Sequence, residues 1–192
     1  MGFLDVLTGK RKLAKPAPDR LFAISTAYVT METGLGTSTR GTAAIVFQPL
    51  ATADFDAIVR DMEEVVKATA TDSGSGTTVT SSDDRYGFRW LVLRGSDFDD
   101  LVVGINAVST ALEAGGYGER LLCAVFAFED SHKRPLYWIY NYKRGMFYPF
   151  APAGTGEQRD NERELVLKAQ IGKELPVEPE LERWFPLWGT PI

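Results

Sequence analysis

Two acidic phrases of nearly identical wording hold the residues of this chain best suited to chemistry. DFDAIV occupies residues 54–59, and DFDDLV occupies residues 97–102. Carboxylate oxygens are the ligands that Mg²⁺ and Ca²⁺ prefer in proteins, so each phrase could mark a metal site. Neither phrase continues into the D-x-D-x-D-G pattern of a calcium-binding loop. The metal interpretation therefore lacks the additional oxygen ligands that it needs.

The alternative is that each phrase starts a helix, because each follows an apolar run and precedes an amphipathic pattern. Thr52 or Asp54 can accept hydrogen bonds from the free amides of a first helical turn. Ser96 or Asp97 can do the same for a second helix. The positive end of the helix dipole also favours the carboxylates of Asp56, Asp99 and Asp100. We therefore expect helix capping at both phrases, with no metal ion and no cofactor.

The chain has one histidine and one cysteine. His132 lies in EDSHKRP, which is typical of a turn, and Cys123 lies in the apolar run LLCAVFAF. We expect a solvated histidine and an inert buried thiol, unless His132 meets Glu129 or Asp130 in a cleft. The sequence contains no HExxH, GxSxG or Walker pattern. GLGTSTRG at 34–41 lacks the spacing and the following helix of a dinucleotide-binding loop, so it predicts a hairpin turn. We predict no catalytic residue.

Aromatic and basic residues alternate in YWIYNYKRGMFYPFAP, residues 137–152. A base-stacking RNA-binding sheet has a similar composition, but the small residue and the second aromatic are misplaced for that consensus. The simplest interpretation is that alternate aromatics pack on the core. A protein-binding patch is the functional alternative, because Tyr, Trp, Phe and Arg dominate interface hot spots. The candidate partner-binding residues, including two from the C-terminal tail, are Lys143, Arg144, Phe147, Tyr148, Phe150, Trp184 and Trp188.

Residues 1–18 differ from the rest of the chain. Apolar residues on one side of about two helical turns are followed by basic residues, which suits an anionic membrane surface. Isolated helices of this length are marginal, so disorder or docking on the domain is an equal alternative. The candidate membrane-surface residues are Phe3, Leu4, Leu7, Lys10, Arg11 and Lys12.

The composition is typical of a globular protein with one domain. The chain has 192 residues, of which 44% are hydrophobic, and a net charge of −5, which disfavours nucleic-acid binding. A single cysteine cannot form an intrachain disulfide, which fits a reducing compartment. No apolar run approaches the roughly 20 residues that cross a bilayer, and the apolar start is too short for a signal peptide. We therefore expect a cytoplasmic protein with one domain at residues 19–192.

Hydrophobic periodicity and turn residues predict an order of β-β-α, β-β-α and β-β-β-α. A short helix at 19–24 precedes it. The predicted strands cover 26–33, 42–48, 77–82, 88–94, 121–128, 136–142 and 146–150, and the helices 54–69, 98–112 and 157–171. Units 26–70 and 77–116 resemble an internal ββα duplication, followed by a β-β-β-α unit over 119–192. This order predicts the α+β class, with an antiparallel sheet and helices on one face. The strand order within the sheet stays open.

Several longer stretches are distinctive beyond what a generic fold requires. They are MGFLDVL at the start, YGFRWLVL at 86–93, DFDDLV, LLCAVFAF, KRGMFYPFAP at 143–152, RDNERELVL at 159–167 and the ending LPVEPELERWFPLWG. Over nearly its whole length the chain thereby resembles the PspA-associated protein PspAB family. The resemblance implies a genomic setting near phage-shock protein A, the membrane-binding coiled-coil protein of envelope stress. It implies no catalytic residue.

The leading interpretation is a non-enzymatic accessory or adaptor protein of the phage-shock membrane-stress response. It would bind phage-shock protein A or an associated stress protein, with weak contact to an anionic membrane surface as a further expectation. The alternative is a small-molecule or lipid-binding domain with a pocket between sheet and helices, lined by aromatics such as Trp90 and Trp138. An enzyme ranks third.

Overall fold

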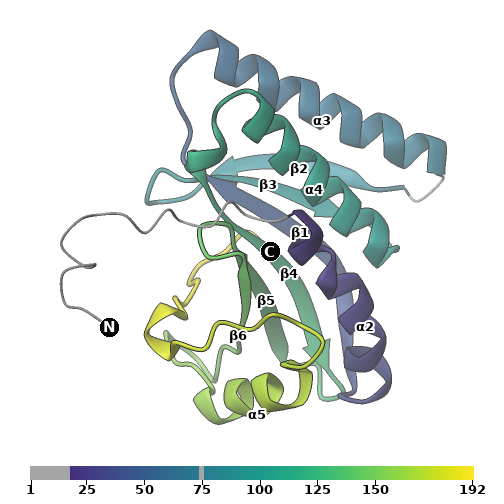
Figure 1. The fold of residues 1–192 in the computed structure, drawn as a ribbon, viewed down its shortest axis with the longest axis vertical. Helices are drawn as coiled ribbons and strands as arrows, with labels where there is room; N and C mark the ends of the chain where they lie inside the picture. The colour runs from purple at the N-terminus through teal and green to yellow at the C-terminus, as the bar shows by residue number, and fades with distance from the viewer. Residues whose placement is uncertain (1–17, 74–75) are drawn as a thin grey trace, which may run out of the picture.

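A computed structural model describes residues 18–73 and 76–192, which form one six-stranded sheet with helices packed on it (Figure 1). The strands are β1 (Thr37–Phe47), β2 (Thr78–Asp83), β3 (Arg89–Arg94), β4 (Leu121–Asp130), β5 (Pro135–Asn141) and β6 (Met146–Phe150). The helices are α1 (Pro18–Leu21), α2 (Ala23–Thr33), α3 (Ala53–Ser73), α4 (Phe98–Ala114) and α5 (Asn161–Ile171), with short 3-10 turns η2 (Gly118–Arg120) and η3 (Leu181–Arg183).

The strand order in the sheet is β2-β3-β1-β4-β5-β6, and every neighbouring pair is antiparallel. Short turns join β2 to β3, β4 to β5, and β5 to β6. The two longer connections carry α3 and α4, so β1 lies between β3 and β4 although neither strand follows it directly in the chain. The predicted α+β class with an antiparallel sheet is therefore confirmed.

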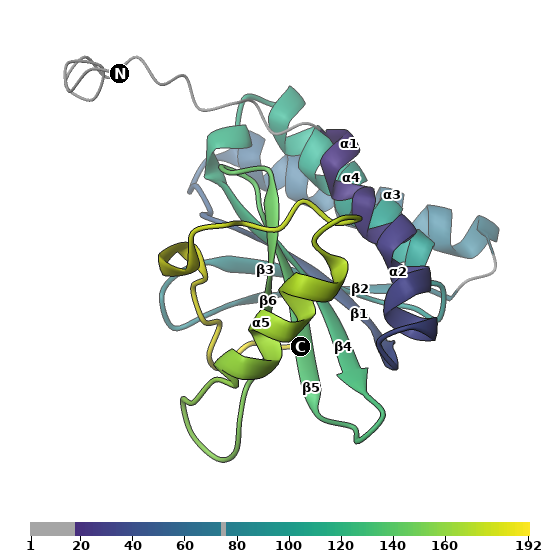
Figure 2. The same ribbon diagram turned by 60° about the horizontal axis from the view of Figure 1, so that its bottom comes forward.

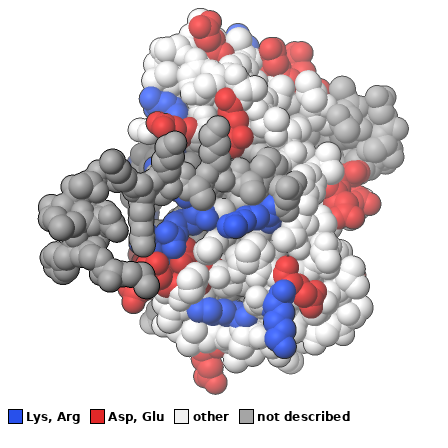
Figure 3. Space-filling view, in the orientation of Figure 1, with Lys and Arg blue, Asp and Glu red and all other residues white. Residues whose placement is uncertain are grey.

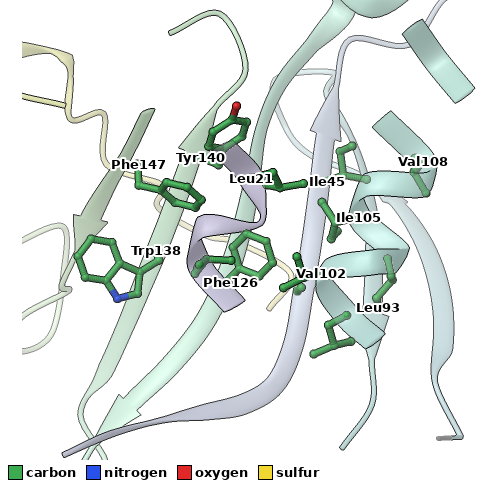
Figure 4. Packing of buried hydrophobic residues seen from close by; sticks show 14 of the residues in the cluster. Leu21, Ile45, Leu93, Val102, Ile105, Val108, Phe126, Trp138, Tyr140 and Phe147 are labelled. Carbon is green, nitrogen blue, oxygen red and sulfur yellow. The ribbon is translucent and has the colours of Figure 1, made fainter. Parts of the chain in front are cut away.

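One face of the sheet is covered by helices. Alternate strand residues such as Ile45, Leu91 and Phe126 point to this face, as the two-residue period of a strand requires. Every longer helix contributes a buried side chain to the same cluster, including Ile24 of α2, Phe55 of α3, Ile105 of α4 and Ile171 of α5. Figure 4 shows part of this cluster, with Ile105 of α4 and Leu21 of α1 beside Ile45 and Phe126 of the sheet. The prediction of helices on one face is confirmed.

The opposite face is covered by the end of the chain. Val46, Val92 and Val125 point to this face and are buried in a second cluster. We call residues 176–192 the C-terminal strap, because they pass β6 after α5 and then cross this face (Figure 2). The strap residues in contact with the second cluster are Val177, Trp184, Leu187, Trp188 and Ile192. The sheet is thus buried on both sides without a second helical layer.

Residues 26–33 form part of α2, so the predicted strand there is wrong, and so is the ββ pair of the first unit. Threonine and valine in this stretch favour strands, but only weakly. The buried residues Ile24, Ala27 and Met31 are spaced three and four positions apart, which is the spacing of one face of a helix. Burial of that face against the sheet decides the conformation, because tertiary packing overrides intrinsic propensity.

Residues 37–41 belong to β1, so the predicted hairpin turn at GLGTSTRG is also wrong. The pairing of β1 with β4 shifts between Thr39 and Thr42, which marks a β-bulge. Gly41 lies in this bulge with φ +63°, and an added Cβ would lie 2.7 Å from the carbonyl oxygen of Gly95. Glycine is needed here for a bulge and for close backbone approach, not for a turn.

Both acidic phrases lie at helix starts, as the capping interpretation predicts. The Thr52 hydroxyl oxygen accepts a hydrogen bond from the Phe55 amide at 3.4 Å, and an Asp97 carboxylate oxygen accepts one from the Asp100 amide at 3.1 Å. In the part of the chain that the structure describes, no group of three or more His, Cys, Asp and Glu side chains could hold a metal ion. The phrases therefore position α3 and α4 on the sheet.

Candidate functional site

The turn between β5 and β6 is tied to the C-terminal strap by an ion pair. The Arg144 guanidinium donates to both carboxylate oxygens of Glu178, at 2.8 and 3.2 Å. The Glu178 side chain is only 2% exposed, whereas Arg144 is 30% exposed. Burial opposes ionisation of Glu178, but the hydrogen bonds from Arg144 and the Glu180 amide outweigh it and lower its pKa. The carboxylate is therefore held charged at the base of the strap.

The strap also closes the outer edge of the sheet. The Phe147 amide donates to the Pro176 carbonyl oxygen, and the Glu178 amide donates to the Phe147 carbonyl oxygen, each at 2.8 Å. Residues 147 and 177 thus form a short parallel bridge beside β6. This pairing satisfies backbone groups that an edge strand would otherwise expose.

A second ion pair joins α5 to the same region. The Arg159 guanidinium donates to both oxygens of Glu164, at 3.1 and 2.8 Å, and also to the Trp184 carbonyl oxygen. Glu164 in addition accepts from the Ala151 amide at 2.8 Å. Burial of Glu164 is the dominant effect and raises its pKa, although Arg159 and the amide act against it. This pair links β6, α5 and the strap.

Trp184 anchors the middle of the strap and is buried. Its indole stacks near the Tyr148 ring with centroids 6.3 Å apart, and its Nε1–H donates to the Glu178 carbonyl oxygen at 3.1 Å. The Lys168 ammonium lies 5.5 Å from the centroid of the same ring, within the range of a cation–π contact. Tyr148 also donates its hydroxyl hydrogen to the Phe185 carbonyl oxygen at 3.1 Å. These contacts hold the strap at Glu178, Trp184 and Phe185.

The predicted partner-binding aromatics are distributed between the core and the strap. Phe147 is buried on the helix face, and Tyr148 and Phe150 are buried on the opposite face. Trp188 is half-buried and lies edge-on to Phe150, with ring centroids 4.8 Å apart. Lys143 is exposed at the tip of the turn. The structure therefore brings these candidates together around β6, but it presents only part of them to solvent.

The structure also exposes strap residues that lie outside the predicted set of partner-binding residues. Leu181 is 46% exposed and Phe185 is 58% exposed, and Arg183 lies exposed between them. We call Leu181, Arg183 and Phe185 the strap rim. The only signal in the sequence was the aromatic pair at 184–185. This pair did not indicate which of the two rings is buried, because the strap contains no α-helix or strand and has no regular alternation of buried and exposed residues.

The groups considered for catalysis do not converge. His132 is exposed in the turn after β4, while Cys123 is buried near the other end of that strand. Asp130 accepts hydrogen bonds from the amides of His132 and Arg134, which places it in the turn as a structural group. Burial raises the pKa of the Cys123 thiol to about 12. A Cys–His nucleophile pair is therefore not formed.

Trp90 and Trp138 do not line one pocket. Trp138 belongs to the cluster on the helix face, and Trp90 belongs to the cluster on the opposite face. The indole Nε1–H of Trp90 donates to an Asp84 carboxylate oxygen at 3.0 Å. The sheet itself separates the two indoles.

The predicted membrane-surface residues Phe3, Leu4, Leu7, Lys10, Arg11 and Lys12 lie outside the described residues. From residue 18 onward, with residues 74 and 75 left aside, no helix combines the length and the apolar character needed to cross a bilayer.

The family comparison matches the whole chain. The family model for PspA associated protein B, or PspAB, matches residues 1–192. No match was found among curated proteins or among solved structures. In the structure, three of the stretches that carried the resemblance pack on one another, namely KRGMFYPFAP at 143–152, RDNERELVL at 159–167 and the C-terminal strap. The chain therefore belongs to the PspA associated protein B family.

Proposed function

We propose that this chain is a non-enzymatic accessory protein that binds a PspA-type protein through the strap rim. The family name describes association with PspA, which supports a partner of this kind. The observation that carries the choice of surface is Phe185, a large aromatic side chain that is 58% exposed on a rigidly held segment. Exposed apolar side chains mark interaction sites where several lie together, and Leu181 is also exposed on this segment.

Rigidity makes the strap rim suited to binding. The carbonyl oxygen of Phe185 accepts from the Tyr148 hydroxyl, and the preceding Trp184 is buried and hydrogen-bonded. A partner would therefore pay little conformational entropy to order this backbone. Arg183 pairs with Glu180, and Glu182 is exposed beside it, so the apolar side chains of the strap rim are flanked by charges of both signs, which can pair with opposite charges on a partner.

A protein of this kind acts in the cytoplasm and reaches the membrane through its partner. Its own ionisable groups support a binding role, because Glu164 and Glu178 are engaged in ion pairs that hold the strap. In this role the protein binds its partner and catalyses no reaction.

The test is the affinity of the purified chain for purified PspA, measured by isothermal titration calorimetry. Phe185→Asp and Leu181→Asp place a charge at the centre of the strap rim, and each should weaken binding by at least about tenfold. Val29→Asp is the matched control, because Val29 is 62% exposed on α2, away from the strap rim. Wild-type affinity in both rim variants, or failure of the unaltered chain to bind, would refute the proposal.

A further inference from the structure

Two hydrogen-bond donors lie beside Gly145. Gly145 lies in the turn between β5 and β6 with φ +64°. An added Cβ at this position would lie 3.6 Å from both Cδ and Nη1 of Arg20, and 3.7 Å from the hydroxyl oxygen of Tyr140. The guanidinium, the phenol and the turn therefore meet at one point, where the glycine leaves only the space of a small side chain.

The Tyr140 hydroxyl has no hydrogen-bond partner among the described residues, although the side chain is only 1% exposed. Figure 4 shows the hydroxyl at the outer end of the ring, directed away from Trp138. Burial raises the pKa of Tyr140 to about 12, so the group remains a protonated donor at neutral pH. A buried polar group without a partner is costly and calls for an explanation.

Arg20 is exposed, and no carboxylate in the described part of the chain forms an ion pair with it. The positive charge of Arg20 lowers the pKa of Tyr140, and the negative charge of Glu113 on α4 raises it. Neither residue forms a hydrogen bond to Tyr140 in the structure. A guanidinium can only donate hydrogen bonds. The missing component at this point is therefore an acceptor.

The charge around the space favours an anionic acceptor. Lys143 lies exposed on the same turn. Figure 3 shows two groups of Lys and Arg side chains near the middle of this face, where Figure 1 places α1 and the β5–β6 turn. The same view shows Asp and Glu side chains beside one of these groups, so the positive charge is confined to a small part of this face.

We propose that Arg20 and Tyr140 bind a phosphate group at the β5–β6 turn, carried by an anionic phospholipid or by a soluble phosphate ester. The guanidinium and the phenol each donate to a phosphate oxygen, and Lys143 adds charge at the rim of the site. Arginine pairs well with phosphate because its planar fork matches the geometry of the oxyanion. The site is separate from the strap rim, and it does not depend on binding of a PspA-type protein.

The first arm of the test measures binding of the full chain to vesicles by co-sedimentation. Vesicles of phosphatidylglycerol and phosphatidylcholine are compared with vesicles of phosphatidylcholine alone. Arg20→Gln and Tyr140→Phe should each weaken binding to the anionic vesicles by about tenfold, since each removes a hydrogen bond to a charged group. Arg40→Gln and Tyr86→Phe make the same chemical changes at exposed positions elsewhere and should leave binding unchanged.

The second arm titrates inorganic phosphate and glycerol phosphate into the ¹⁵N-labelled chain and follows the Gly145 amide signal. We expect a saturable shift of this signal that both variants weaken. If the variants leave vesicle binding unchanged, the shift supports the phosphate site and assigns it to a soluble ester. The proposal is overturned if neither arm responds to the variants. A variant with Lys10, Arg11 and Lys12 all changed to Gln tests the N-terminal basic residues. The proposal is also overturned if only this variant loses vesicle binding and the Gly145 amide signal does not shift with phosphate.

A further measurement separates loss of binding from loss of folding. Thermal unfolding followed by circular dichroism should show Tyr140→Phe at least as stable as the unaltered chain without phosphate, because the variant removes an unpaired buried hydroxyl. Added phosphate should raise the melting temperature of the unaltered chain more than that of Tyr140→Phe at the same concentration. The same response in both proteins would overturn the role given to the Tyr140 hydroxyl.

Discussion

Two buried carboxylates, Glu164 and Glu178, hold the last third of the chain together, and their pKa values shift in opposite directions. Each side chain is 2% exposed and is bound by one guanidinium. Burial dominates at Glu164 and raises its pKa, whereas hydrogen bonds dominate at Glu178 and lower its pKa. The fold therefore favours the charged form of Glu178, which suits its pair with Arg144 to attach the strap.

Arg144→Ala should lower the free energy of unfolding by about 2–3 kcal/mol, because it leaves the Glu178 carboxylate buried without its cation. The expected loss is below that of a fully buried pair, since Arg144 is 30% exposed. Arg183→Ala is the matched control, because Arg183 pairs with Glu180 at an exposed site and should cost less than about 1 kcal/mol. Urea denaturation measures both, and equal losses would contradict the assignment.

Acid should weaken the attachment of the strap in a defined range of pH. A carboxyl whose pKa is lower in the folded state contributes stability that is complete above its unfolded pKa and disappears as the pH falls through the folded pKa. For Glu178 the loss therefore begins below about 4.5, the value of an unperturbed glutamate. Glu164 acts in the opposite direction, because its pKa is raised, and it offsets part of this loss.

The measurement is the free energy of unfolding by urea between about pH 7 and about pH 3.5, for the unaltered chain and for Glu178→Gln. Glu178→Gln should be less stable at neutral pH and should lose less stability on acidification. A variant whose stability falls as steeply as that of the unaltered chain would show that Glu178 is not a source of the acid sensitivity.

At the scale of elements, α2 shows a conflict between composition and packing. Its sequence AISTAYVTMET is rich in β-formers, yet it forms a helix because Ile24, Ala27 and Met31 must lie on one face to meet the sheet. The free energy of burying three apolar side chains exceeds the few tenths of a kcal/mol per residue that propensity contributes. The conformation of α2 is therefore set by the sheet beneath it.

Thr26→Ala tests this directly, because Thr26 is an exposed position of α2. In a helix the substitution should raise the free energy of unfolding by about 0.5 kcal/mol, since alanine has the higher helix propensity. Thr78→Ala is the matched control at an exposed position of strand β2, where the change should lower stability by a similar amount. Urea denaturation gives both signs, and a loss of stability in Thr26→Ala would contradict the helical assignment.

At the scale of the whole molecule, the strap replaces a second layer of helices. It closes the β6 edge through the bridge at residues 147 and 177, and it covers the second face through Trp184, Leu187 and Trp188. Cys123 lies in the cluster beneath it, with its pKa raised to about 12 by burial. The thiol is therefore a reporter of whether the strap is closed.

Native Cys123 should react slowly with a disulfide reagent such as DTNB, because reaction requires both exposure and ionisation of the thiol. Trp184→Ala removes the central anchor of the strap and should accelerate the reaction by at least about tenfold, through more frequent local opening. Val29→Ala on the exposed side of α2 should leave the rate unchanged. An unchanged rate in Trp184→Ala would mean that the strap does not control access to this face.

The local pattern of the chain was enough to predict most elements and their class. The helix starts at Thr52 and Asp97, the apolar run of β4, and the hairpin from β5 to β6 follow from capping residues and periodicity, which act over a few neighbouring positions. The family could also be recognised from stretches along the chain. These features are encoded locally, so the sequence determines them by itself.

Only the tertiary structure decided which side chains form a surface. Tyr148 and Trp184 are buried, whereas Leu181 and Phe185 are exposed, and no local pattern distinguishes them. Their burial depends on contacts such as Arg144 with Glu178, 34 positions apart, and Arg159 with Trp184, 25 positions apart. The meeting of Arg20 with Tyr140 and Gly145 is of the same kind. Such pairings arise when distant segments pack in three dimensions, because burial and charge partners are properties of the assembled fold.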